Sequence, residues 1–130
     1  MPIATSLHHI ALQYSNRSQA DIFFIEILNL RKVKHFNLSP ELSDMIFGIA
    51  KPVEVDVYGN DVLSIEVFFI ENQRQPNDFT HVCITVSDRA TFIRRCEQHH
   101  LTPFTVQKDG KEYLFVRDFS GNLFEVKVTK

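Results

Sequence analysis

The sequence contains no apolar run near the roughly 20 residues that a bilayer-spanning helix needs. Its first residues, MPIATSLHH, lack the basic flank and the apolar core of a signal peptide, so we expect a cytoplasmic protein. The formal net charge of -2 leaves no broad basic surface for a phosphate backbone. Cys83 and Cys96 show no Cys-x-x-Cys spacing and are expected to be reduced thiols. We therefore expect neither nucleic acid nor a membrane as a partner.

A single domain over residues 1–130 is expected, because a chain of 130 residues that is 44% hydrophobic can bury one core. Within it, one strand pattern occurs twice. The stretch FTHVCITVSDR, from Phe79, nearly repeats LHHIALQYSNR, from Leu7, at an offset of 72 residues. The offset aligns three identical pairs: His9 with His81, Ser15 with Ser87, and Arg17 with Arg89. Each copy is followed by a polar break and a helical apolar pattern, which indicates a duplicated module.

Each half continues in the same order after its first strand. Apolar residues at helical spacing predict one helix face in each half, formed by Ala20, Phe23, Phe24, Ile27 and Leu28 and by Phe92, Ile93 and Cys96. Three β-patterned stretches follow each helix, at residues 31–38, 44–50 and 61–71 and at residues 104–110, 112–118 and 122–128. We predict βαβββ modules over residues 5–72 and 78–130, joined by a polar linker at residues 71–78. Residues 39–44 and 51–59 have no counterpart in the second half and are expected to lengthen a hairpin.

Alternation along the strands places four metal-binding side chains on equivalent faces. The apolar set of each module's first strand should face the helix, which turns His9 and His81 to the opposite face. The same rule turns Glu66 and Glu125, on the last strands, to that face. Two imidazoles and two carboxylates are the composition of a divalent metal site. The candidate ligands are therefore His9, Glu66, His81 and Glu125.

These stretches resemble the vicinal oxygen chelate superfamily, the fold of glyoxalases, bleomycin resistance proteins and extradiol dioxygenases. The resemblance runs from LHHIAL through FTHVCITV to DFSGNLFEV. The last stretch is similar to the family's D-P-x-G-x-x-x-E ending, with Asp118, Gly121 and Glu125 in place and Phe119 where proline is common. The resemblance implies an α+β fold in which two βαβββ modules form a curved mixed-sheet cup, usually in a homodimer. The modules can pair within one chain or between chains, and the sequence leaves both arrangements open.

The ligand pattern is most similar to that of glyoxalase I-like members. It implies a metal-dependent lyase or isomerase that acts on a small α-hydroxy carbonyl or related metabolite through an enediolate, with Glu125 or Glu66 as the base. The residues do not choose among zinc, nickel, cobalt, manganese and iron. Gln13 stands where bacterial glyoxalase I enzymes resemble one another in carrying an arginine for glutathione, which argues against glutathione as co-substrate.

Several alternatives remain beside this hypothesis. One is a non-enzymatic protein that sequesters a small molecule, as bleomycin-resistance relatives do, with Phe47, Phe68 and Phe115 lining the cup. Another is an epimerase of the methylmalonyl-CoA type, although such enzymes tend to have glutamine in place of Glu66. The fourth ligand, Glu66, also disfavours an extradiol dioxygenase. Fosfomycin-modifying relatives use three protein ligands and a potassium-binding loop, for which the sequence offers no clear match.

Overall fold

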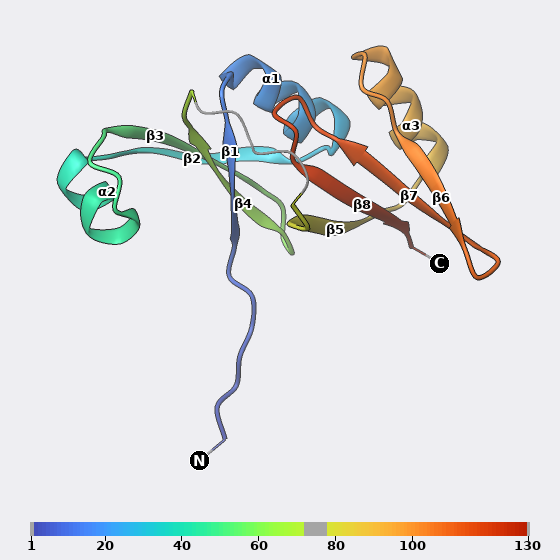
Figure 1. The fold of residues 1–130 in the computed structure, drawn as a ribbon, viewed down its shortest axis with the longest axis horizontal. Helices are drawn as coiled ribbons and strands as arrows, with labels where there is room; N and C mark the ends of the chain where they lie inside the picture. The colour runs from blue at the N-terminus through green and yellow to red at the C-terminus, as the bar shows by residue number, and fades with distance from the viewer. Residues whose placement is uncertain (1, 72–77, 130) are drawn as a thin grey trace.

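The computed structural model describes residues 2–71 and 78–129 (Figure 1). The first half runs through β1 (Ile10–Tyr14), α1 (Arg17–Asp21), η1 (Ile22–Ile27), β2 (Arg31–Leu38), α2 (Pro40–Phe47), β3 (Val53–Gly59) and β4 (Ser64–Phe69). The second half runs through β5 (His81–Val86), α3 (Arg89–Gln98), β6 (Phe104–Lys108), β7 (Lys111–Arg117) and β8 (Leu123–Val128). Most of the predicted linker, residues 72–77, lies outside the described residues.

Each half forms a four-stranded mixed sheet with the same strand order. The orders are β1-β4-β3-β2 and β5-β8-β7-β6. In both sheets the first strand of the module pairs in parallel with its last strand, and the remaining pairs are antiparallel. A parallel pair needs a long crossover connection, which the helix and the two intervening strands supply. The predicted α+β class and the two βαβββ units are confirmed.

The strand predicted at residues 44–50 is wrong, because most of this segment belongs to the helix α2. The Ser39 side chain accepts a hydrogen bond from Leu42 N at 3.2 Å, Pro40 occupies the first turn, and Gly48 ends the helix with φ 70°. Residues 51–59 are likewise not extra hairpin length, since β3 within them occupies the place that β7 has in the second sheet. The addition in the first module is therefore α2.

The two predicted helices begin at equivalent positions of the repeat. The Asn16 side chain accepts from Gln19 N at 3.0 Å, and the Asp88 side chain accepts from Thr91 N at 3.0 Å. After α1 the chain widens into the π-helical turn η1. No helix within residues 2–71 and 78–129 combines the length and the apolar character that crossing a bilayer requires.

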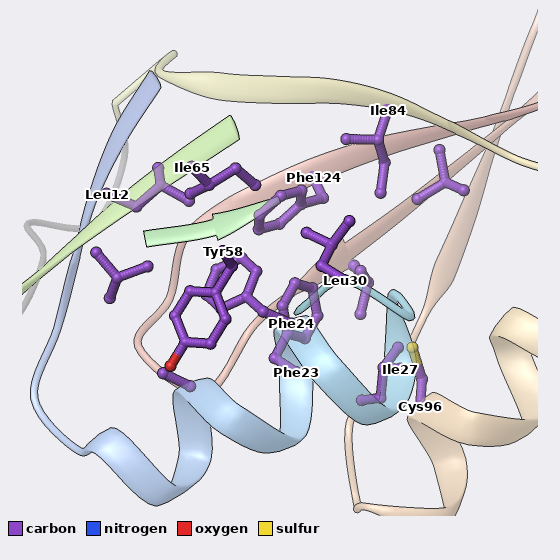
Figure 2. Close-up of a cluster of buried hydrophobic side chains, with 14 of the residues drawn as sticks. Leu12, Phe23, Phe24, Ile27, Leu30, Tyr58, Ile65, Ile84, Cys96 and Phe124 are labelled. Carbon is purple, nitrogen blue, oxygen red and sulfur yellow. The ribbon is translucent and has the colours of Figure 1, made fainter. Parts of the chain in front are cut away.

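One hydrophobic core joins the two modules. The helices α1 and α3 lie on the same side of the sheets (Figure 1), and the buried side chains lie between the helices and the strands (Figure 2). Phe23 of η1 and Phe124 of β8 are both 0% exposed, and their ring centroids are 5.0 Å apart. Cys96 is buried in this core, Cys83 is exposed, and both thiols are free, as expected. Side chains on the opposite sheet faces are left available for a site.

Candidate metal centre

The first predicted ligand pair lies where β1 meets β4. His9 immediately precedes β1, and Glu66 lies on β4 opposite Ala11. His9 Nε2 is 3.4 Å from Glu66 Oε1, and the two side chains are 37% and 22% exposed. The other ring nitrogen of His9 is 2.8 Å from His8 Nδ1. The imidazole is thus held by one nitrogen and directs the other toward the glutamate.

The second pair has the same form. His81 begins β5, and Glu125 lies on β8 opposite Cys83. His81 Nε2 is 3.7 Å from Glu125 Oε1, and His81 Nδ1 is 2.9 Å from the carbonyl oxygen of Phe79. In a neutral imidazole that donates from Nδ1 to a carbonyl, Nε2 carries a lone pair. Two lone pairs then face each other across this gap, and a cation between them would bind both.

The two pairs occupy equivalent positions in their sheets. In the first sheet, Glu66 is opposite the residue two positions after His9. In the second sheet, Glu125 is opposite the residue two positions after His81. This equivalence requires the first and last strands of each module to be neighbours, which strand alternation alone did not predict.

Within one chain the four residues form two pairs and do not gather into a quartet. No group of three or more His, Cys, Asp or Glu side chains in the described part of the chain is close enough to hold a metal ion. A single chain therefore carries two His–Glu pairs, each with one imidazole nitrogen and one carboxylate, and we call these two pairs half-sites because each offers two candidate ligands.

The spacing within each half-site suits two ligands of one divalent ion. Ligand atoms about 2.1 Å from a common ion stand roughly 3.0–3.4 Å apart at octahedral or tetrahedral angles. The observed nitrogen-to-oxygen distance is 3.4 Å for His9 and Glu66, at the upper end of this range, and 3.7 Å for His81 and Glu125, which would have to approach slightly to share an ion. Imidazole and carboxylate ligands suit several first-row divalent metals. The residues present fit a divalent metal ion, provided that two half-sites meet.

Glu125 also contacts a cation that sequence analysis did not single out. Lys127 Nζ is 3.4 Å from Glu125 Oε2, whereas Oε1 faces His81. Lys127 follows Glu125 by two positions on β8, so both side chains lie on the same face of the sheet. The Glu-x-Lys spacing in a strand was the signal that could have identified this neighbour.

Aromatic side chains lie near both glutamates, because Phe68 follows Glu66 by two residues on β4 and Phe115 on β7 is opposite Glu125. The Phe47 and Phe68 rings meet with centroids 5.5 Å apart, and both line a pocket of about 150 Å³ that also includes Gln13. Phe115 stacks on Phe104, again with centroids 5.5 Å apart. Phe47 and Phe68 thus line one small pocket and Phe115 another, and their lining of one common cup stays a prediction.

Solved structures with the same architecture are found at low sequence identity. FosX, a fosfomycin resistance protein from Listeria monocytogenes, matches with a TM-score of 0.72 and 14% identity, over 98% of this chain and 96% of that chain. A glyoxalase family protein from Enterococcus faecalis matches with a TM-score of 0.71 and 18% identity, over 93% and 95% of the two chains. The chain has the vicinal oxygen chelate fold. No family model and no curated protein matches the sequence.

A further structure that shares this vicinal oxygen chelate fold contains a metal. A mutant of the Listeria protein, with a TM-score of 0.73 and 13% identity over 96% of this chain and 90% of that chain, was solved with Mn(II) and 1S,2S-dihydroxypropylphosphonic acid. At this identity the likeness establishes the fold, and the chemistry of the present chain must be argued from its own residues.

The repeated arginine makes an equivalent ion pair in each module. Arg17 Nη2 is 3.3 Å from Glu54 Oε1 at the start of β3, and Arg89 Nη2 is 2.9 Å from Glu112 Oε2 on β7. Each arginine opens a helix and links it to the third strand of its own module. The identical pair Arg17 and Arg89, which supported the duplication, thus stabilises equivalent helix-to-strand contacts in the two modules.

A buried ionic network on the helix side of the first sheet has no equivalent among the predicted site residues. Asp56 on β3 is 1% exposed and accepts hydrogen bonds from Arg17 Nε at 2.9 Å and His35 Nδ1 at 2.6 Å. Lys32 Nζ is 3.1 Å away. Burial alone would raise the pKa of Asp56, but hydrogen bonds from these three groups outweigh it and hold the pKa below its ordinary value. His35, whose face the sequence left open, therefore belongs to this network.

Asp56→Ala should destabilise the protein by about 3 kcal/mol at pH 7, because it leaves partly buried cations without their carboxylate. Exposed Glu54 provides the control, and Glu54→Ala should cost less than about 1 kcal/mol. Because the folded-state pKa of Asp56 is lowered, its contribution is present above the unfolded value of about 3.9 and is lost as the pH falls through the folded value. Urea unfolding at pH 7 and pH 3 measures both effects. Equal losses for the two variants at pH 7 would contradict this role.

The Asp118–Asn122 loop positions the strand that carries Glu125. The buried Asp118 carboxylate accepts from Ser120 N at 3.0 Å and from Asn122 N at 2.8 Å, while Gly121 adopts φ 82°. The Asn122 side chain donates to Gln13 O on β1 at 3.1 Å, which ties the second module to the first. Asp118 and Gly121, which match the family's ending, thus shape the loop that leads into β8 and its candidate ligand Glu125.

Proposed function

We propose that this protein binds a divalent metal ion between His9 and Glu66 of one chain and His81 and Glu125 of a second chain. The observation that carries the proposal is the His81 ring, whose Nδ1 is placed to donate to Phe79 O while Nε2 faces Glu125. Metal-binding histidines usually donate their other ring N–H in this way. The two equivalent but separate half-sites favour a homodimer in which each ion is shared between chains.

The reaction that this ligand set supports best is the isomerisation, or related lyase chemistry, of a small α-hydroxy carbonyl compound. A divalent ion, when bound, would polarise the carbonyl group and stabilise negative charge that develops on it. Glu66 or Glu125 would remove the proton beside the carbonyl and return it to the neighbouring carbon. The aromatic side chains near the half-sites would exclude water during this transfer.

Exchange of substrate protons with deuterium tests this function without knowledge of the natural substrate. With zinc-, nickel- or manganese-loaded protein in deuterium oxide, the hydroxymethyl proton signal of hydroxyacetone should disappear about 100-fold faster than with the Glu66→Gln, Glu125→Gln double variant. Free metal ion at the same concentration is the second control. Exchange no faster than with free metal would contradict proton-transfer chemistry on this compound class.

Sequestration of a small apolar molecule is the second candidate function. The pocket of about 150 Å³ lined by Phe47 and Phe68 supports it, because a pocket of this size can hold a small apolar group without any chemistry. Tight binding of an aromatic ligand to protein that carries no metal, together with no proton exchange, would favour this alternative.

A further inference from the structure

The two halves of the proposed site differ at one position beside the glutamates. Lys127 follows Glu125 by two residues, whereas Phe68 follows Glu66 by two residues. Lys127 Nζ is 3.4 Å from Glu125 Oε2, and its side chain is 57% exposed. Phe68 instead packs against Phe47. One half of the site therefore offers an ammonium group, and the other half offers an aromatic ring.

A pocket of about 400 Å³ adjoins Lys127 at the place where the pairing of β7 with β8 ends, beyond Leu114 and Val126. Its charged lining consists of Arg89, Lys111, Glu112, Glu125 and Lys127. Arg89 and Glu112 neutralise each other at 2.9 Å. Lys111 forms no ion pair or side-chain hydrogen bond with the residues that the structure describes. Three cations and two carboxylates thus leave this pocket with one excess positive charge in the metal-free protein, and a metal bound to Glu125 would add to it.

A second pocket shares residues with the first and is mainly apolar. It has a volume of about 260 Å³ and is lined by Val106, Lys108, Tyr113, Phe115 and Glu125. Tyr113 and Glu125 belong to both pockets, and Phe115 is extended by the stacked ring of Phe104. The apolar second pocket and the basic first pocket are therefore neighbours, and the proposed metal ligand Glu125 lies in both.

We propose that the substrate carries an oxyanion, either a carboxylate or a phosphonate, which Lys127 and Lys111 bind while its apolar body lies on Phe115 and Tyr113. This inference rests on the proposed function, because the substrate must reach the metal ligand Glu125. Lysine binds such anions mainly as a point charge, so either oxyanion is compatible with the pocket. Lys127 is then a specificity-determining residue, since its ammonium group, 3.4 Å from Glu125, attracts an anionic substrate to this metal ligand and does not attract an uncharged analogue.

Binding of matched anionic and neutral probes to metal-free protein tests the proposal directly. Benzoate and benzamide have nearly the same shape and differ in charge, and phenylphosphonate presents the other oxyanion. In ¹⁵N–¹H NMR titrations at low salt, wild-type protein should bind at least one of the anions about 10-fold more tightly than benzamide. Lys127→Gln should abolish most of this preference, whereas Lys51→Gln, which removes an exposed lysine from the β3 side, should preserve it. Which anion binds more tightly assigns the oxyanion.

Equal affinities for benzoate, phenylphosphonate and benzamide in wild-type protein would overturn the proposal, as would equal losses in the Lys127→Gln and Lys51→Gln variants. Measuring zinc content distinguishes a failure of the anion-binding proposal from a failure of the proposed metal centre. The Lys127→Gln variant retains all four proposed ligands and loses a cation that competes with metal for Glu125, so it should bind at least as much zinc as wild-type protein. If wild-type protein binds no zinc, the metal centre is wrong, and the anion preference of the metal-free protein still decides the role of Lys127.

Discussion

Glu66→Gln and Glu125→Gln should each lower the affinity for zinc by more than about 100-fold. Changes to groups that only support a metal ligand already cost 10- to 100-fold, and loss of a ligand's charge should cost more. Each glutamate lies beside an imidazole nitrogen, at 3.4 Å for His9 and 3.7 Å for His81, so the two losses should be similar. Glutamine preserves the shape of each side chain and removes its charge.

Inductively coupled plasma mass spectrometry on tag-free, zinc-incubated and dialysed protein measures this effect. Wild-type protein should retain about one ion per chain, because a dimer with two shared sites has as many sites as chains. Glu97→Gln, a change at an exposed residue of α3, is the matched control and should retain the same amount. Zinc retained by both single variants, or absent from wild-type protein, would contradict the proposed ligand set.

Phe124→Ala should destabilise the protein by about 3–5 kcal/mol, the usual cost of removing a fully buried phenylalanine. Phe124 is 0% exposed and contacts Phe23, so the cavity would open between the second sheet and the helix of the first module (Figure 2). Because both modules line this cavity, they should lose stability together and unfold in one transition.

Urea unfolding followed by both circular dichroism and tyrosine fluorescence measures the loss of stability. Phe79→Ala removes a ring that is 97% exposed and should change the free energy of unfolding by less than about 0.5 kcal/mol. Two separate transitions in wild-type protein would mean that the modules do not share one core. A loss below about 1 kcal/mol for Phe124→Ala would show that its site is not tightly packed.

The repeat at an offset of 72 residues was enough to predict the duplication, and the same strand order in the two sheets agrees with it. The offset that aligns His9 with His81 also places Arg17 and Arg89 at equivalent helix starts. Strand alternation was enough to predict that each histidine shares a face with a glutamate, and the structure pairs them as His9 with Glu66 and His81 with Glu125.

Local periodicity failed where a short apolar run fits either a strand or a helix. The segment at residues 44–50 was predicted as a strand, but the Ser39–Pro40–Glu41 start provides a capping residue, a first-turn proline and a first-turn acid. Asp56 was missed for a related reason. It lies within the apolar strand β3, and its partners come from distant segments, so only the folded chain reveals that Arg17 and His35 surround it.

The arrangement of the two half-sites could not be predicted from either strand alone. It depends on how the modules pack, and this is set by the shared core around Phe23 and Phe124 on the opposite side of the sheets. That packing satisfies the apolar faces within one chain but leaves the two ligand pairs apart. In the proposed function, the four ligands therefore meet only when two chains associate.

Subunit mixing tests this central claim most directly. The Glu66→Gln chain has an intact second half-site, and the Glu125→Gln chain has an intact first half-site. If sites are shared between chains, an equal mixture after refolding together should regain about a quarter of the wild-type zinc content, because half of the dimers are mixed and each has one intact site. If each site lies within one chain, or if the four residues do not bind metal together, the mixture will retain no more zinc than the two variants do separately.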